Sequence, residues 1–578
     1  MMSLFQQLSR SLQAPATAKR YRDAGIGLMF IALIQLLVVP AQMAMDLHSI
    51  NLPASILVML LCSLLMIIAN CIHGGVAQFY TKHLQGPTDF LGRHMSFGFV
   101  ASFVMLNRDH VTNALDVPKI AGAFVITTLV SYVAAFLLAS GGFKLETAIR
   151  GRRMKSPDLE SNNKSWPRPS ESWPAPPTEG SPKRLSQLGR LNETLAQNGS
   201  LASLEPATQA PTSPYIDYIV RTAPVWICIF LLATVGIPIY FATSYGTPFE
   251  ALCFILLWVI SVQFQRCLKA SCGLLQFPRL RSILIIFANP VMVTWALGTA
   301  FLWIKTAYTR QTMDTVISEF RRHDTLAQSV MNIAVDHNLA AHIGAGDLAG
   351  PVLDAGIVCL GFKMYEYRQE LWASFSTVFS TCTVLAAINV FLNVLVAHAL
   401  GLQAEDAVAF AARSVTIALG VPAVQNLGGS TALMSAFVIF GGIIFQMTGD
   451  WLFSVLHIND RRCSSAQKPA AEDGNDGSDA EKKSSSPSSS TLSGLFDIVG
   501  LGRGKDQQKS GGADDGRIVA AGVAVGINAA AMGTSHLIER DSRATAYSAL
   551  SMTVFGAMTV ALTAIPGVSE AMASMTSR

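Results

Sequence analysis

The chain has 578 residues, of which 51% are hydrophobic and only 14% are charged, and its formal net charge is +4. A soluble domain usually carries about 25% charged residues, so this composition argues against a soluble enzyme, and the small net charge argues against a nucleic-acid-binding protein. The mean hydropathy of +0.40 instead predicts an integral, multi-pass membrane protein.

The first 22 residues form a basic flank that contains no acidic residue. Its basic side chains are Arg10, Lys19, Arg20 and Arg22. Such a segment is typical of an organellar transit peptide, and it is equally typical of a cytoplasmic flank before a first membrane span. The sequence leaves both interpretations open, so a mitochondrial inner or plastid-like membrane and the plasma membrane all fit.

Residues 23–141 are predicted to form a first membrane module with about four hydrophobic elements. A spanning helix needs about 20 apolar residues to cross the hydrocarbon core. Residues 95–106 are apolar but short, and we expect a helix there to extend over 90–110. The longer runs of this module cover residues 24–45, 53–72 and 117–141.

Two long polar segments interrupt the apolar pattern. Residues 142–214 are rich in Pro, Ser, Asn and charged residues, and residues 459–512 are rich in Ser. Neither segment has enough apolar surface to offset the entropy of ordering, so both are predicted to be disordered. The basic stretch Gly151–Lys155 follows the fourth hydrophobic element and favours a cytosolic or matrix-like side for that end.

Residues 215–458 and 513–578 are predicted to be the first and last parts of a second membrane module. Residues 308–343 are mixed in character and are expected to form an amphipathic excursion outside the membrane. Together the two modules predict an all-α, polytopic transmembrane helix bundle of about 12 membrane elements. The apolar runs of the second module cover residues 222–243, 249–265, 282–304, 349–364, 372–400, 405–420, 431–457, 517–535 and 544–565.

Several runs of the second module are poor continuous helices. Asn289-Pro290 lies inside one run, Gly420 and Pro422 interrupt a second, and the segment 526–539 is small, polar and rich in Gly. Non-helical backbone at membrane depth persists only where it is buried in protein or lines a wet cavity. We therefore expect discontinuous or re-entrant helices in the C-terminal half, which are typical of a transporter site.

Arg413 is the sharpest single feature, because it lies in an apolar run whose nearest acidic residue in the sequence is Asp406. An arginine at mid-bilayer costs roughly 2.5–3.5 kcal/mol on insertion scales. An anionic ligand would offset that cost through the planar guanidinium, and so would carbonyl groups or an acid such as Asp347 or Glu539. An arginine that extends to the membrane interface would avoid the cost. Ser414 and Thr416 flank Arg413, and their hydroxyls are suited either to substrate oxygens or to backbone carbonyls.

Two further segments offer free backbone N–H groups to a small anion, namely Asn426–Thr431 and Met532–Ser535. His536 follows the second segment and is suited either to a coupling proton or to an interfacial hydrogen bond. The predicted substrate-binding residues are Asn289, Arg413, Ser414, Thr416, Asn426, Gly428, Gly429, Asn528, Gly533, Thr534 and Ser535, and the predicted coupling or ion-pair residues are Asp347, His536 and Glu539.

No metal-ligand spacing and no nucleophile–base arrangement is visible, and the nine cysteines include no C-x-x-C pair. We therefore expect no metal, no cofactor and no enzymatic activity. The expected partners are a small carboxylate anion and the lipid bilayer, and not a nucleic acid. A homodimer is compatible with Gly-rich helix faces such as that at 440–445.

Four segments, in this order, resemble the LrgB/CidB family of membrane proteins: "NPVMV" at 289–293, "ARSVTIAL" at 412–419, "STALMSAFVIFGGIIF" at 430–445 and "AAGVAVGINAAAMGTSHLIE" at 520–539. The stretch "INLPASILVMLL" at 50–61 resembles the LrgA family, with Leu52, Pro53 and Ser55 at the signature positions. The sequence departs from the LrgB pattern at Ala530, where that family carries a histidine.

A fusion of LrgA-like and LrgB-like modules resembles the layout of plant plastidal glycolate/glycerate translocators. The resemblance implies secondary transport of small 2-hydroxy monocarboxylates, by exchange as an antiporter or by proton coupling. An arginine among hydroxyls and free amides suits such an anion. The alternatives are a holin-like or regulatory membrane protein without carrier activity, the role attached to bacterial relatives in murein hydrolase export, and a channel or inactive scaffold.

Overall fold

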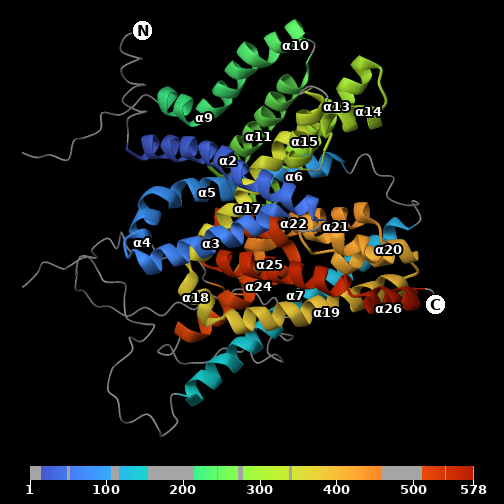
Figure 1. Ribbon diagram of the computed structural model, residues 1–578. Coiled ribbons are helices and arrows are strands. Elements are labelled where there is room, and N and C mark those ends of the chain that lie inside the picture. The colour runs from blue at the N-terminus through green and yellow to red at the C-terminus, as the bar shows by residue number, and fades with distance from the viewer. Residues whose placement is uncertain are drawn as a thin grey trace, which may run out of the picture. The chain divides into compact units, whose positions relative to one another are not determined.

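The computed structural model describes residues 15–48, 53–105, 116–153, 214–243, 245–270, 278–323, 325–337, 342–456, 458, 511–540 and 542–576 (Figure 1). The chain divides into two compact units. One comprises Met1–Lys19 and Thr147–Ala223, and the other comprises Arg20–Glu146 and Pro224–Arg578. The second unit therefore contains helices from both predicted membrane modules, and it holds all of the predicted site residues.

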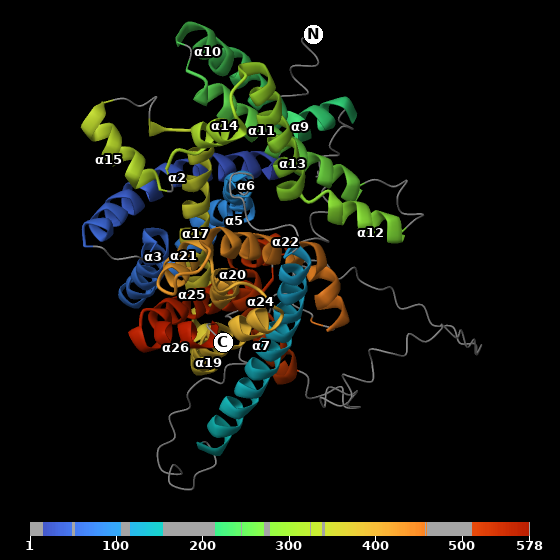
Figure 2. The same cartoon turned by 90° about the vertical axis from the view of Figure 1, so that its right-hand side faces the viewer.

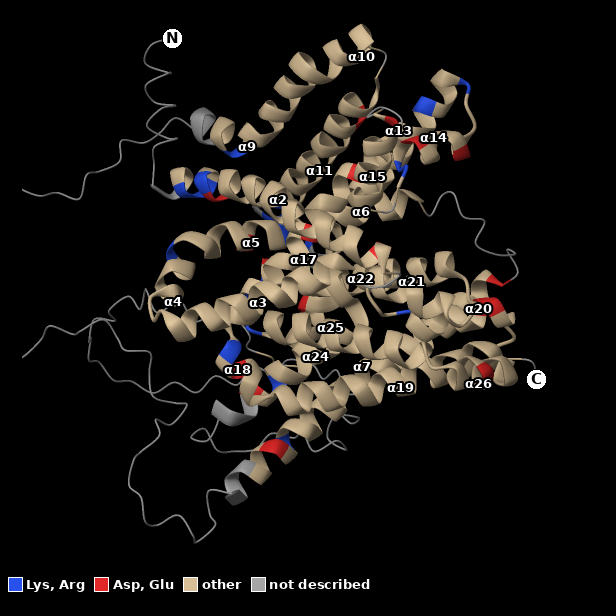
Figure 3. Cartoon of the chain, viewed as in Figure 1, with Lys and Arg blue, Asp and Glu red and all other residues tan. Residues whose placement is uncertain are grey.

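The described residues form helices and no β-strand, which confirms the predicted all-α class. Ten helical segments are long and apolar enough to cross a membrane, and charged residues are sparse along the ribbons (Figure 3). These segments lie in α2 (Pro15–Leu47), α3 (Ala54–Ile72), α7 (Val117–Arg153), α9 to α10 (Pro214–Leu231 and Ile237–Thr243, joined by the π-helical turn η3, Leu232–Gly236), α11 (Thr247–Ala270), α17 (Ala349–Glu366), α19 (Phe375–Ala399), α22 (Thr431–Val455), α24 (Gly511–Glu539) and α25 (Ala544–Thr563).

Shorter helices connect or interrupt these segments. α14 and α15 fall in the predicted excursion 308–343, and each begins at a threonine cap, Thr312 or Thr325, whose side chain accepts a backbone N–H. The remaining helices are α4 (Val76–Phe79), η1 (Tyr80–Leu84), α5 (Gln85–His94), α6 (Ser96–Met105), α12 (Pro278–Phe287), the 20-residue α13 (Pro290–Thr309), α14 (Met313–Phe320), α15 (Leu326–Asp336), η5 (Gly346–Leu348), α18 (Arg368–Ala373), α20 (Ala404–Ala409), η6 (Phe410–Ala412), α21 (Ile417–Gln425) and α26 (Pro566–Thr576).

The centre of the second unit is the pair α24 and α25. The membrane-spanning part of α24 is buried along its whole length. Gly522 and Gly526 lie so close to α25 that a Cβ would overlap with atoms of Tyr547 and Ser551. In a bilayer, where lipid is as apolar as a leucine side chain, such small residues let two helices gain close van der Waals contact.

Helices from the N-terminal part of the chain pack directly on this centre. α3, α5 and α6 lie against α17, and α5 also lies against α24. α7 runs beside α22, where Phe124 stacks on Phe437 and Tyr132 stacks on Phe445 (Figure 2). The predicted first and second modules therefore share one core within this unit.

The predicted discontinuities are present in the structure. The chain leaves helical geometry between α12 and α13 at Asn289 and between η6 and α21 at Thr416. α24 is kinked at Ala530, which adopts φ 46° and ψ −138°, a conformation that is uncommon for a residue with a Cβ.

The boundaries of the polar segments differ in part from the prediction. α7 continues to Arg153, beyond the predicted module end at residue 141. α24 begins at Gly511, so the last two residues of the segment predicted to be disordered, 511 and 512, are helical. The rest of the two segments predicted to be disordered, 154–213 and 459–510, lies outside the described residues.

Candidate anion site

A polar junction forms where α6, α13, α22 and α24 meet. Asn289 caps α13, since its Oδ1 accepts the backbone N–H of Val291 at 2.9 Å, and its Nδ2 donates to Oε1 of Gln446 at 2.9 Å. Gln446 in turn donates from Nε2 to the carbonyl oxygen of Met532 at 3.3 Å. The break at Asn289-Pro290 is thus linked through α22 to the kinked helix α24.

Ser96 and Ser535 complete this junction. Their hydroxyl oxygens lie 2.9 Å apart, and Ser535 also donates to the carbonyl oxygen of Gly92 at 3.2 Å. Gln446 Nε2 lies 3.5 Å from the Ser96 hydroxyl. Two of the residues predicted from sequence, Asn289 and Ser535, are therefore brought into one hydrogen-bonded group.

A cavity of about 110 Å³ lies beside the junction. That volume holds several water molecules or one small organic anion. The N-terminus of α13 lines it through Asn289, Pro290 and Val291, so the positive end of a helix dipole lies at its wall. The remaining lining residues are Arg93, His94, Ser96, Trp258, Val262, Gln265, Arg266, Lys269, Ile285, Gln446, Met447, Asp450, His536 and Glu539.

The cavity lining carries three basic side chains, Arg93, Arg266 and Lys269, and two acidic ones, Asp450 and Glu539. Burial, followed by the nearby charges of Arg266, Arg93 and Arg20, lowers the pKa of His94 to about 4, so His94 is neutral near pH 7. Within the described part of the chain, neither Arg93 nor Arg266 forms an ion pair with a carboxylate, although the charge of Glu539 acts on Arg266. These arginines make the cavity attractive to an anion.

Asp450, His536 and Arg540 form an ion-pair group at the edge of the same cavity. Arg540 Nη1 donates to Oδ1 of Asp450 at 2.7 Å, and Nε2 of His536 lies 3.4 Å from the same oxygen. Arg540 also lies over the ring of Phe453. The predicted ion-pair residues His536 and Glu539 therefore do lie at this cavity, while the carboxylate of Asp450 is largely exposed.

Comparison with known proteins relates a large part of the second unit to one protein family. The family model described as "LrgB-like family" matches residues 278–467 and 515–566, a range that contains α13, α17, α22, α24 and α25. The chain contains an LrgB-like module. This confirms the resemblance for these residues, whereas the LrgA resemblance of residues 23–141 stays a prediction.

The curated relatives support the same assignment. Holin-like protein CidB of Staphylococcus aureus is 27% identical over 111 residues, which is 19% of this chain and 48% of that protein. Holin-like protein CidB of Staphylococcus epidermidis is 25% identical over the same extent. The chain thus spans about half the length of the curated relatives it matches. No solved structure matches the chain.

Arg413 occupies a different place in the LrgB-like module. Its side chain is 2% exposed, and it donates from Nη1 to the Thr128 hydroxyl at 2.9 Å and from Nη2 to the Thr127 carbonyl at 2.8 Å. Both partners belong to α7, outside the LrgB-like match. Among the alternatives for Arg413, the structure therefore shows the carbonyl pairing, and Arg413 is not among the residues that line the cavity.

The residues predicted to act with Arg413 are buried but do not converge on the cavity. Ser414 and Thr416 flank the break before α21, and the Thr416 hydroxyl has no hydrogen-bond partner among the described residues. Asn528 donates to the Ala524 carbonyl at 3.0 Å within its own helix. Thr534 bonds to the Ala530 carbonyl at 2.9 Å and lies 2.8 Å from the Ser548 hydroxyl of α25.

Gly533 and the turn Asn426–Thr431 serve packing and connection. Gly533 lies against Val525 and Phe445, where a Cβ would be too close to the valine. Asn426 and Gly428 are exposed in the turn between α21 and α22, and Gly428 has φ 73°. Gly429 is half-buried against Val408. Within the described residues, no hydrogen bond joins this turn to Asn289 or Ser535.

Asp347 holds a loop rather than lining the cavity. Its Oδ2 accepts the backbone N–H groups of Gly344 at 2.8 Å and Arg322 at 3.3 Å. These bonds tie the connection after α14 to the start of α17. The predicted coupling role of Asp347 has no support in these contacts.

Sequence reasoning missed five residues that line the cavity: Arg93, His94, Ser96, Arg266 and Gln446. Gln446 had a detectable signal, since it is the lone amide in the apolar run 431–457. Arg93 and Arg266 lie at the ends of apolar runs, where an arginine ordinarily reaches toward water, so their convergence had no signal in the sequence.

Proposed function

We propose that the protein is a secondary carrier of small monocarboxylates of the glycolate and glycerate type, and that it binds them in the cavity between α5, α11, α13, α22 and α24. The observation that carries the proposal is the joint presence, in one cavity, of Arg93, Arg266 and the N-terminus of α13. Both arginines are exposed side chains, and a concentration of positive groups of this kind attracts a small anion.

The chemistry of the lining suits a carboxylate that also carries hydroxyl groups. A guanidinium presents paired donors that match the two oxygens of a carboxylate. The amides of Asn289 and Gln446 and the hydroxyl of Ser96 offer both donors and acceptors for a neighbouring alcohol.

The position of the cavity supports transport rather than static binding. Its wall includes a helix break at Asn289-Pro290, and Gln446 connects that break to the helix that is kinked at Ala530. Discontinuous helices at a central site are the usual arrangement in secondary carriers, because each half can move separately.

The direct test is uptake of radiolabelled glycolate and glycerate into proteoliposomes that contain the full chain. Saturable uptake is expected from the wild type. Arg93→Gln and Arg266→Gln should each lower uptake at low substrate concentration by about tenfold or more, since a charge-assisted hydrogen bond contributes about 1.5–3 kcal/mol. Arg310→Gln is the matched control, because Arg310 is exposed at the C-terminal end of α13.

The names of the curated relatives, holin-like protein CidB, favour one alternative function, that of a holin-like membrane protein. A holin-like activity would release solutes without saturation and without selection for a carboxylate. The same proteoliposomes, loaded with an uncharged dye, distinguish the two functions. Dye release without saturable carboxylate uptake would contradict the carrier proposal.

A further inference from the structure

Asp354 is a carboxylate inside a membrane-spanning helix. It lies on α17, within the apolar segment Gly346–Glu366, eight residues from the beginning of that segment and twelve from its end. At a rise of about 1.5 Å per residue, roughly 12 Å of helix lies on one side of it and roughly 18 Å on the other. A carboxylate in such a place is costly, so the groups around it indicate what the position does.

The partners of Asp354 are uncharged. Its carboxyl group is hydrogen-bonded by Ser55 of α3 and by Gln35 of α2. Within the described part of the chain, no Lys, Arg or His forms an ion pair with Asp354, and no basic charge acts on it. The residues beside this polar group belong to an apolar cluster that includes Ile34, Val38, Val58, Ala355 and Val358.

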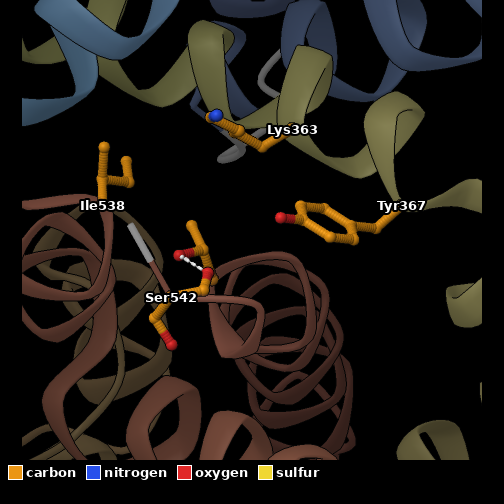
Figure 4. A pocket seen from close by; sticks show the side chains of 5 residues that line it. Lys363, Tyr367, Ile538 and Ser542 are labelled. Carbon is orange, nitrogen blue, oxygen red and sulfur yellow. Dashed lines mark hydrogen bonds between the residues drawn. The ribbon is translucent and has the colours of Figure 1, made fainter. Parts of the chain in front are cut away.

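A second carboxylate that packs on α17 has a different setting. Asp89 of α5 contacts Nζ of Lys363, near the C-terminal end of α17. Lys363 also lines a cavity of about 10 Å³, close to the size that holds one water molecule, together with Tyr367 and Ser542 (Figure 4). Among the described residues, α17 thus supplies a cation to Asp89 and none to Asp354. The charge of Asp354 has to be neutralised by other means.

The side chain of Gln35 shows what is missing. Its Nε2 donates to the carbonyl oxygen of Pro351 at 3.3 Å, whereas its Oε1 is buried and has no hydrogen-bond partner among the described residues. An ionised Asp354 can only accept hydrogen bonds, so it leaves this oxygen without a donor. A protonated carboxyl group adds an O–H donor and can pair with the amide in both directions. One proton therefore removes both a buried charge and an unpaired acceptor.

We propose that Gln35, Ser55 and Asp354 form a proton-binding site inside the membrane part of the protein, in which the neutral Asp354 carboxyl group donates to Oε1 of Gln35. A proton fits this site better than a metal ion, because the amide nitrogen of Gln35, a donor, is directed to the carbonyl of Pro351 and to Asp354. The site does not involve the anion cavity and goes beyond the proposed function.

The proton-binding site joins α17 of the LrgB-like module to two helices that precede that module, α2 and α3. Loss of the proton leaves a negative charge without a cation between these helices. Binding of the proton therefore strengthens the packing of α2 and α3 on α17, and the stability of the second unit depends on pH through this site.

Other titratable groups lie on α17 and on the elements packed against it, so the readout must separate them from Asp354. None of them acts on the charge of Asp354. Within the second unit these groups are Arg20, Tyr21, Arg22, Asp23 and Asp46 of α2, Cys62 and Cys71 of α3, Asp89, Arg93 and His94 of α5, Asp347 of η5, Arg368 and Glu370 of α18, Tyr547 of α25, and Cys359, Lys363, Tyr365 and Glu366 of α17 itself.

The experiment is infrared difference spectroscopy of the full chain in proteoliposomes while the pH is raised. A protonated carboxyl group gives a carbonyl stretching band that a carboxylate lacks. The wild type should keep such a band near neutral pH, where exposed carboxylates are ionised, and Asp354→Asn should lose it. Asp46→Asn is the matched control and should leave the band unchanged, because Asp46 of α2 is exposed although Gln42 also donates to it, at 2.7 Å.

A second variant tests the pairing with the amide. Gln35→Leu keeps Asp354 and removes its amide partner, so the band should move to a higher frequency as the carbonyl group loses a hydrogen bond. Thermal unfolding tests the effect on packing. The midpoint for the wild type should fall over the pH range in which the band disappears, whereas the midpoint for Asp354→Asn, which cannot ionise there, should fall less.

Four outcomes would overturn the inference. The first is a wild type without the band at every pH at which it is folded, and the second is a folded Asp354→Asn that keeps the band. If Asp354→Asn does not fold, an unmoved band in Gln35→Leu decides against the site. Loss of the wild-type band on addition of sodium at constant pH would identify a metal-ion site instead. None of these readouts uses carboxylate uptake, so they are independent of the proposed function.

Discussion

Arg413 and the pair Arg93 and Arg266 place arginines in two chemically different settings of the same unit. The two terminal nitrogens of Arg413 donate to the carbonyl of Thr127 and the hydroxyl of Thr128, and its buried Nε has no hydrogen-bond partner among the described residues. The other two line a cavity and form no ion pair with a carboxylate in the described part of the chain. The high free-energy cost of placing an arginine in a membrane shows that the position is constrained. The groups that the arginine contacts then decide whether it stabilises the fold or binds a ligand.

The largest expected effect is on the cavity side of this comparison. Arg93→Gln combined with Arg266→Gln should lower saturable carboxylate uptake by more than about 100-fold, because two charge-assisted interactions of about 1.5–3 kcal/mol each are lost. The thermal midpoint of unfolding in detergent should change little. Uptake that stays within a few-fold of the wild type would assign the anion to another place in the unit.

Arg413→Ala is expected to act on stability instead. It removes a large buried side chain and leaves the Thr127 carbonyl and the Thr128 hydroxyl with fewer partners, which should lower the free energy of unfolding by about 2–4 kcal/mol. Uptake per folded molecule should be retained. An unchanged midpoint of thermal unfolding together with abolished uptake would instead support Arg413 as the anion-binding residue.

Asn289→Ala should produce a smaller, mixed effect. It removes the cap of α13 and the hydrogen bond to Gln446, so we expect a stability loss of about 1–2 kcal/mol and a rise in the KM for carboxylate of about tenfold. Asn289→Asp keeps the capping acceptor and adds a negative charge to the cavity. Asn289→Asp should therefore be more stable than Asn289→Ala but should bind the anion more weakly. Lower stability together with tighter anion binding would contradict the placement of the anion beside Asn289.

The smallest effects separate two neighbours on α24. Ser535→Ala should raise the KM for carboxylate a few-fold, since Ser535 belongs to the junction with Ser96. Thr534→Ala should lower the free energy of unfolding by about 1 kcal/mol and leave the KM unchanged, since Thr534 faces Ser548 of α25. Uptake and unfolding measurements on both variants check this. Equal effects of the two substitutions on the KM would contradict the assignment of Ser535 to the polar junction and of Thr534 to the contact with α25.

Local chemistry made several features predictable. The polytopic helical class follows from long apolar runs, since a bilayer requires every backbone group to be bonded within its own helix. The break at Asn289-Pro290 follows from the missing amide hydrogen of proline and from the capping ability of asparagine. Ser535 was predicted to bind substrate because small polar residues in an apolar run stand out, and it lies in the polar junction with Ser96.

The sequence by itself thus determined the membrane class, the approximate spans and the places where helices break. The tertiary structure alone decided which polar side chains meet there. Ser96 reaches Ser535 across 439 positions of the chain, and Arg413 reaches Thr128 across 285. Such pairings depend on how whole helices pack, which is set by many weak contacts between distant segments rather than by the residues beside the site. For that reason the sequence pointed to Arg413, whereas only the structure shows that Arg93 and Arg266 line one cavity.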